Sequence, residues 1–94
     1  MIQYNITPEE ITIKGHAGHG KAGTDIVCAG VSCLVETVSD ALEELCPGTQ
    51  SESGSGYYHI LLPGKYPEEE IIRAVFEIGM GKIAATYPEC VEKI

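Results

Sequence analysis

The sequence predicts a single α+β domain over residues 1–94, with a four-stranded sheet that carries two helices in the order strand, strand, helix, strand, strand, helix (ββαββα). Three observations predict this fold class. The chain has 94 residues, of which 44% are hydrophobic, and this is enough for one compact core. Two segments have patterns typical of strands: the first alternates apolar and polar residues, and the second is rich in aromatic and branched residues. Two other segments repeat apolar residues at helical spacing.

The chain begins with a predicted hairpin. Apolar residues alternate with polar ones on both sides of a TPEE turn, at Ile2, Tyr4, Ile6, Ile11 and Ile13. The next segment, GHAGHGKAG at residues 15–23, is rich in glycine and has no apolar periodicity. We therefore expect a flexible loop after the second strand.

A helix is predicted from Thr24, a plausible N-cap, to the CPG sequence at residues 46–48. Asp25 would lie in its first turn, where the helix dipole favours a negative charge. Six apolar residues fall within about 80° of one another on the helical wheel and form a predicted core stripe. They are Val27, Val31, Leu34, Val38, Leu42 and Leu45.

The second half of the chain predicts another hairpin and another helix. Residues 49–55 are polar, but they precede GYYHILL at residues 56–62, which is typical of a strand. Pro67 then begins a helix with three glutamates in its first turn. Its apolar residues on one face are Ile71, Ile72, Val75 and Ile78.

Composition excludes several classes of protein. The formal charge of −8 and a pI near 4.6 disfavour direct nucleic-acid binding, because a phosphate backbone would be repelled. We find no apolar run long enough for a membrane span and no secretion signal, so we expect a cytoplasmic protein with no membrane partner. The four cysteines match no dense disulfide framework and are expected to be thiols.

The candidate chemistry lies where the glycine loop meets the first helix. His16 precedes most of the loop, and Cys28 follows it in the first turn or so of the helix, where unpaired amides and the helix dipole stabilise a thiolate. A cysteine protease needs a thiolate, a nearby imidazole and donors for the oxyanion. Taken singly, Cys28 could equally be a small buried residue and His16 an ordinary loop residue, and the residues alone leave both interpretations open.

Neighbouring residues leave further alternatives. Asp25 could cap the helix or orient His16, and His19 is a second imidazole in the loop. His16 and His19 have the HxxH spacing of a zinc site, but Cys33 lies about 140° around the helix from Cys28, so these ligands would not converge. The loop lacks the GK[ST] sequence of a phosphate-binding loop, and His59 is expected to be structural. We expect no metal and no cofactor.

GHAG at residues 15–18, followed by GTDIVCAGVS at residues 23–32, closely resembles the ribosomal-processing cysteine protease family, Prp. The match couples a Gly-His-Ala signature to an Asp-Ile-Val-Cys-Ala helix start at the family's spacing. The resemblance implies a homodimeric bacterial enzyme that removes a short N-terminal extension from a large-subunit ribosomal protein. It also implies cleavage after bulky apolar residues and before a small one, with His16 and Cys28 as the catalytic pair.

Two alternatives remain beside this cysteine endopeptidase. One is a noncatalytic homodimeric protein that keeps the fold to bind a ribosomal or other partner, and the other is a small zinc-binding domain. The presence of both His16 and Cys28 favours the protease.

Overall fold

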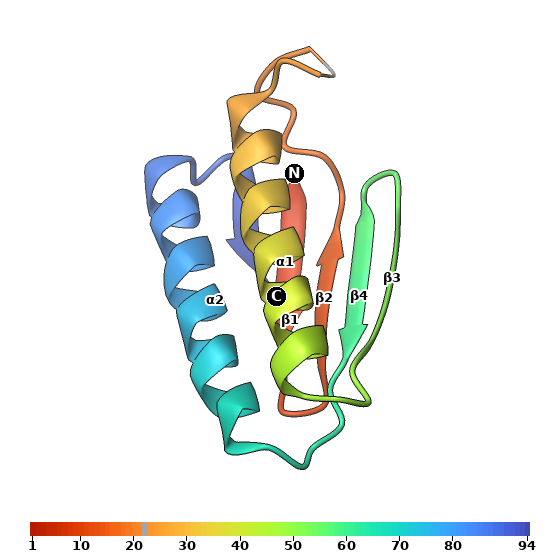
Figure 1. The fold of residues 1–94 in the computed structure, drawn as a ribbon. Coiled ribbons are helices and arrows are strands. Elements are labelled where there is room, and N and C mark those ends of the chain that lie inside the picture. Colours follow the sequence, from red (N-terminus) through yellow and green to blue (C-terminus); the bar gives the residue numbers. More distant parts are fainter. Residues whose placement is uncertain (22) are drawn as a thin grey trace.

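The computed structural model describes residues 1–21 and 23–94. It contains five strands and two helices, which are drawn in Figure 1. In chain order they are β1 (Ile2–Ile6), β2 (Glu10–Lys14), α1 (Ile26–Leu45), β3 (Gln50–Gly54), β4 (Tyr57–Leu61), α2 (Pro67–Thr86) and β5 (Val91–Lys93).

The strands form one mixed sheet in the order β3-β4-β2-β1-β5. The two predicted hairpins are present, and β2 pairs with β4 between them; all three of these pairings are antiparallel. β5 adds to the far side of β1 in parallel, with Val91 opposite Ile2. The prediction of a four-stranded sheet in the order ββαββα is therefore wrong. It missed a strand of three residues, which is too short to show an alternating pattern.

Both helices cover the same face of the sheet (Figure 1), and the core lies between the two layers. The strand side chains that point into it include Ile2, Tyr4, Ile11, Ile13 and Ile60, each at most 5% exposed. Alternate residues occupy the other face, which no helix covers. There His59 Nε2 lies 3.0 Å from Glu10 Oε2.

Helix α1 is capped by Asp25 and not by Thr24, because the Asp25 side chain accepts the amides of Val27 and Cys28. Its buried apolar residues are Val27, Val31, Val35, Val38 and Leu42, which confirms most of the predicted stripe. Leu45, predicted to be in the core, is 53% exposed because it lies in the last turn, and Cys46 at the C-cap is buried in its place.

Of the predicted apolar face of helix α2, only Ile72 packs against the core. Phe76 and Met80 are fully buried, whereas Ile71, Val75 and Ile78 are 56–65% exposed. Gly79 allows the two helices to approach closely, since a Cβ at this position would lie 2.7 Å from Leu34 Cδ2. The helix begins at Pro67, as predicted, and the buried Glu69 carboxylate accepts amides from the preceding loop.

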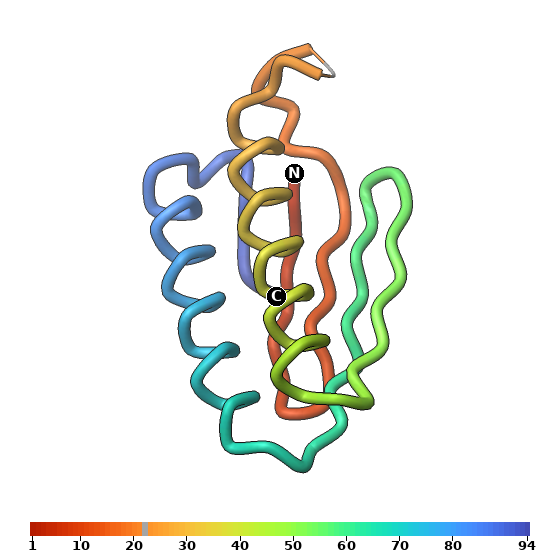
Figure 2. The backbone as a smooth tube through the Cα atoms, viewed as in Figure 1, coloured from red at the N-terminus to blue at the C-terminus, as the bar shows by residue number. Residues whose placement is uncertain are grey.

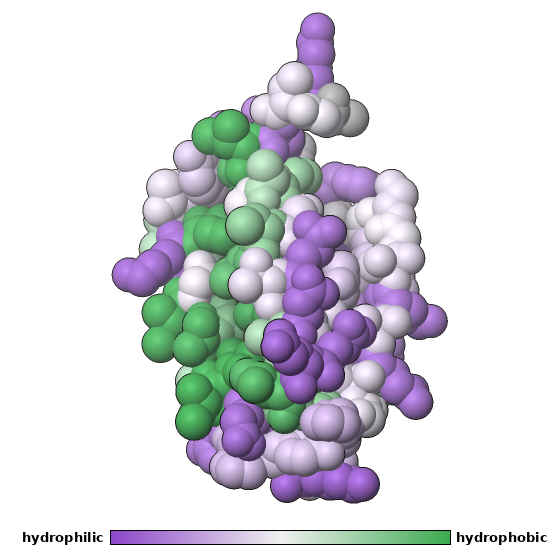
Figure 3. All heavy atoms as spheres, viewed as in Figure 1, coloured by the Kyte–Doolittle hydropathy of each residue, from purple (hydrophilic) through white to green (hydrophobic). Residues whose placement is uncertain are grey.

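Figure 3 shows the resulting hydrophobic area over the two helices, on the face that they present to solvent. Exposed apolar residues of the two helices are Ile71, Val75 and Ile78 of α2 and Ile26 and Leu45 of α1. Within residues 1–21 and 23–94, neither helix combines the length and the apolar character required to span a bilayer.

Candidate active site

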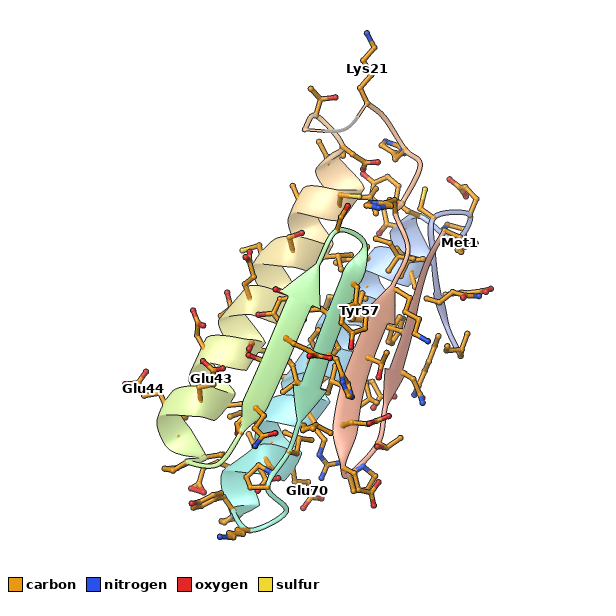
Figure 4. All side chains as sticks on the ribbon, turned by 90° about the vertical axis from the view of Figure 1, so that its right-hand side faces the viewer. Met1, Lys21, Glu43, Glu44, Tyr57 and Glu70 are labelled. Carbon is orange, nitrogen blue, oxygen red and sulfur yellow. The ribbon has the colours of Figure 1, made fainter. Side chains whose placement is uncertain are left out.

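Three segments meet at one end of the sheet: the loop after β2, the start of α1 and the β3–β4 turn (Figure 2). Lys21 lies at the outer tip of this loop, whereas Glu43, Glu44 and Glu70 lie toward the opposite end of the molecule (Figure 4). Two adjoining cavities, of about 250 Å³ and about 620 Å³, open between the three segments. Both cavities are lined by His16, Cys28, Ser32 and Ser55.

The structure places both predicted site residues at these cavities. His16 comes two residues after β2 and is exposed, and Cys28 is the third residue of α1 and is half-buried. The backbone N–H of Ala17 donates a hydrogen bond to Cys28 Sγ over 3.4 Å. An amide donor of this kind stabilises a thiolate. Because Ala17 follows His16 directly, this contact joins the histidine segment to the thiol.

The backbone around His16 is held by contacts from distant parts of the chain. The Met1 ammonium donates to the His16 carbonyl oxygen over 2.6 Å, and the Gly15 amide donates to the Gly56 carbonyl oxygen over 2.8 Å. Gly15 adopts a φ of +99°, and a Cβ there would lie 2.1 Å from the Met1 carbonyl oxygen. Only glycine therefore fits at the position before His16.

Asp25 joins the loop to the helix. It is 7% exposed, and its Oδ1 accepts the amides of Val27 and Cys28 at 2.9 and 3.1 Å. Its Oδ2 accepts the amides of His19 and Gly20 at 2.8 and 3.1 Å. Burial alone would raise the pKa of Asp25, but these four amide donors outweigh it and hold the pKa below its usual value.

The amides bound to Asp25 matter for the choice of donors to the oxyanion that a cysteine protease must stabilise. Backbone amides of a loop or a helix start can act as such donors. In this structure the amides of His19, Gly20, Val27 and Cys28 are engaged with the Asp25 carboxylate. Asp25 thus has the capping role that the sequence left open, and it also anchors the loop.

The smaller cavity has an apolar wall and a polar rim. Its apolar lining comes from both layers of the fold: Ile2, Ile13, Val31, Val35 and Tyr58. The turn residues Gly54, Ser55 and Gly56 complete it beside His16. This turn was not predicted to be part of the site. The glycines at positions 54 and 56 were the only available signal, and they are equally typical of an ordinary hairpin.

The remaining histidines and cysteines lie elsewhere. The His19 ring packs edge-on against Tyr87, with centroids 5.0 Å apart. Cys33 is exposed on α1, whereas Cys46 and Cys90 are buried, and burial raises the pKa of both buried thiols. Over the described parts of the chain, 1–21 and 23–94, no three His, Cys, Asp or Glu side chains are grouped so that they could hold a metal ion.

Comparison with known protein families gives a match over residues 1–92 to the family described as "Cysteine protease Prp". Two curated relatives, both named "Ribosomal processing cysteine protease Prp" and from strains of Staphylococcus aureus, are 35% identical over 54 residues. The aligned segment is 54% of this chain and 51% of the relative, so the chain spans about half the length of the curated relatives it matches.

Solved structures share the fold. The S. aureus ribosomal processing protease Prp with a covalently linked product peptide has a TM-score of 0.85 at 23% identity, covering 98% of this chain and 94% of that one. The same protein with a substrate peptide gives a TM-score of 0.80 at 22% identity, covering 99% and 95%. The SMU.848 protein of Streptococcus mutans gives a TM-score of 0.73 at 29% identity, covering 99% and 91%.

Proposed function

We propose, from the premise that this chain belongs to the cysteine protease Prp family, that it is a cysteine endopeptidase with Cys28 as nucleophile and His16 as general acid and base. The family expected from the two sequence signatures is confirmed, and it is a family of cysteine proteases, which are hydrolases. The assignment of Cys28 and His16 is our own and rests on their place in this chain.

The observation that carries this assignment is the hydrogen bond from the Ala17 amide to Cys28 Sγ. It joins the residue after His16 to the thiol, although eleven positions separate His16 from Cys28 in the sequence. Cys28 also lies in the first turn of α1, where the helix dipole favours a negative sulfur. The shared cavities leave room for a substrate carbonyl beside both side chains.

In the proposed reaction the Cys28 thiolate attacks the scissile carbonyl carbon, and a C–S bond forms. Protonated His16 gives its proton to the leaving amine as the C–N bond breaks. His16 then takes a proton from water, which hydrolyses the thioester and frees the new carboxylate. The cycle needs no metal or cofactor and returns both side chains to their starting protonation states.

For the substrate we propose the N-terminal extension of a large-subunit ribosomal protein, cut after bulky apolar residues and before a small one. Two observations support a peptide of this kind. The S. aureus relative is named as a ribosomal processing protease and has been crystallised with a substrate peptide and with a covalently linked product peptide. In this chain, the smaller cavity beside Cys28 has an apolar lining that suits a large apolar side chain.

We further propose that residues 1–94 act as one protease domain and that the protein works as a homodimer in the cytoplasm. The homodimer follows from the family resemblance. The exposed apolar residues of α2, Ile71, Val75 and Ile78, are the surface in this chain that a second copy would most favourably cover. Analytical ultracentrifugation at micromolar concentration tests this, since a monomer there would contradict it.

The decisive experiment is incubation of the purified protein with peptides that carry N-terminal extensions of large-subunit ribosomal proteins. Mass spectrometry should detect cleavage at one bond by the wild type and none by Cys28→Ala. Cys33→Ala is the matched control, because Cys33 is exposed on the same helix and lines neither cavity. Binding of the peptides without cleavage by the wild type would favour a noncatalytic binding protein of the same fold.

A further inference from the structure

The β3–β4 turn lies directly against the imidazole of His16. Gly56 in this turn has a φ of +66°, and a Cβ added to it would lie 2.6 Å from His16 Nε2, 3.1 Å from Cδ2 and 3.2 Å from Cε1. Real Cβ atoms do not approach other atoms as closely as 2.6 Å. The backbone of the turn therefore occupies the space beside the outer edge of the ring, and it can do so only because position 56 has no side chain.

The turn is also fixed to the backbone that carries His16. Strands β2 and β4 pair up to Lys14 and Tyr57, and the Gly15 amide extends this ladder by donating to the Gly56 carbonyl oxygen over 2.8 Å. The main chain of Gly56 is therefore hydrogen-bonded to the residue before His16. Because Gly56 has no side chain, it can also lie close to the His16 ring. A shift of the turn would move the surface against which the ring rests.

We propose that Gly56 is a positioning residue of the active site, and that the β3–β4 turn sets the placement of the His16 imidazole relative to Cys28. This inference rests on the proposed function, in which His16 serves the thiol. The turn is polar and exposed at Ser55 and adds no residue to the apolar core, but it lines the smaller cavity and packs on His16.

Displacement of a catalytic group by about 1 Å can lower a rate on the order of a hundredfold. Gly56→Ala would require a displacement of about this size, because ordinary contact between a Cβ and a ring atom begins near 3.4 Å. Gly64 provides a matched control. Its φ of +73° is nearly the same, so alanine is equally strained there, but nothing lies within 4 Å of an added Cβ.

The test uses iodoacetamide, which needs no substrate, and follows alkylation of Cys28 at pH 7 by peptide mapping. The wild type is compared with His16→Ala, Gly56→Ala, Gly64→Ala and the double variant His16→Ala/Gly56→Ala. We expect His16→Ala and Gly56→Ala each to slow Cys28 by roughly tenfold, and Gly64→Ala to leave it unchanged. In the His16→Ala background, Gly56→Ala should have no further effect, because no ring remains to be moved.

The outcomes separate the two proposals. If His16→Ala alkylates like the wild type, the proposed catalytic pair fails. If His16→Ala is slow and Gly56→Ala is fast, the pair stands and the positioning role of Gly56 is wrong. An equal effect of Gly56→Ala with and without His16 would also overturn the positioning role, since it would then act by another route.

Folding of each variant is checked by urea unfolding. If Gly56→Ala alone does not fold, recovery of folding in His16→Ala/Gly56→Ala would show that the ring is what the methyl group meets. Failure of the double variant to recover would mean that strain in the turn explains the loss, and this would overturn the proposal. Among the three histidine signals in the NMR spectrum, Gly56→Ala should shift that of His16 most.

Discussion

Asp25 offers a substitution that separates the cap of α1 from the anchoring of the loop. Its Oδ1 accepts the two helix amides, of Val27 and Cys28, and its Oδ2 accepts the two loop amides, of His19 and Gly20. Asparagine keeps one carbonyl oxygen for the cap but replaces the other oxygen by an NH₂ group, which is a donor and would face two further donors. We therefore expect Asp25→Asn to keep the cap and to release the loop.

The expected magnitudes follow from this division. Loss of an N-cap lowers the Tm of a domain of this size by roughly 4–8 °C, and Asp25→Ala, which also loses the loop contacts, should reach at least this. Asparagine caps helices about as well as aspartate, so Asp25→Asn should lower the Tm by less. Because the released loop carries His16 at its base, cleavage should fall in both variants, by roughly 10- to 100-fold in kcat/KM.

The assay pairs thermal unfolding by circular dichroism with cleavage of an N-terminal ribosomal peptide followed by mass spectrometry. Asp40→Asn is the control, since Asp40 is an exposed aspartate on the same helix. Amide NMR signals of His19 and Gly20 report directly whether the loop has been released. Wild-type cleavage by Asp25→Asn, with those two amides shifted, would refute the view that Asp25 anchoring positions His16.

Three further predictions concern the site and its stability. Cys28→Ala and His16→Ala should each abolish cleavage with the Tm nearly unchanged. His19→Ala should keep most activity. If His19→Ala is inactive and His16→Ala is active, the base is His19 and not His16. Stability should fall with acid: burial would raise the pKa of Asp25 and Glu69, but their amide donors outweigh it and hold both pKa values down. Each carboxylate therefore stabilises the fold above its unfolded pKa of about 4, and this contribution is lost as the pH falls below that value through the folded pKa. Urea midpoints measured between pH 7 and pH 2 should decline below about pH 4, less steeply in Asp25→Asn, and a flat profile would contradict the assignment. Purified protein should contain no stoichiometric zinc by elemental analysis and should not unfold with a chelator; one zinc per chain that is lost together with the fold would favour a metal-binding domain.

The elements that the sequence predicted well are those with long local patterns. Helix α1 shows a repeated apolar stripe and a polar residue at its start, and both properties can be identified without knowledge of the rest of the fold. Strand β5 has only Val91 buried. It forms because it pairs with the open edge of β1, which is almost the full length of the chain away in the sequence. Helix α2 is apolar on more than one side, so its periodicity could not show that Phe76 and Met80 face the core in preference to Ile71.

The same distinction holds at the site. A glycine loop between a strand and a helix brings His16 and Cys28 to the same cavities, but the residues alone left their pairing open, and the prediction of a catalytic pair came from the family resemblance. The contact of Gly56 with His16 joins positions that are 40 residues apart. Gly56 also lies in a turn that resembles any other hairpin turn. The double use of Asp25 was equally hidden, because a sequence shows that a residue can cap a helix but not what else its second oxygen meets.

The pairing of β1 with β5 makes the cavity wall depend on a segment that lies far away in the sequence. β1 lies between β2, which follows it directly in the sequence, and β5, which is separated from it by all the other elements described. Until residues 91–93 pair with β1, one edge of this strand keeps unpaired backbone groups. Ile2, which forms part of the cavity wall, then also lacks the hydrogen bond from its amide to the Cys90 carbonyl oxygen. The wall of the cavity beside Cys28 is therefore complete only when β5 has joined the sheet.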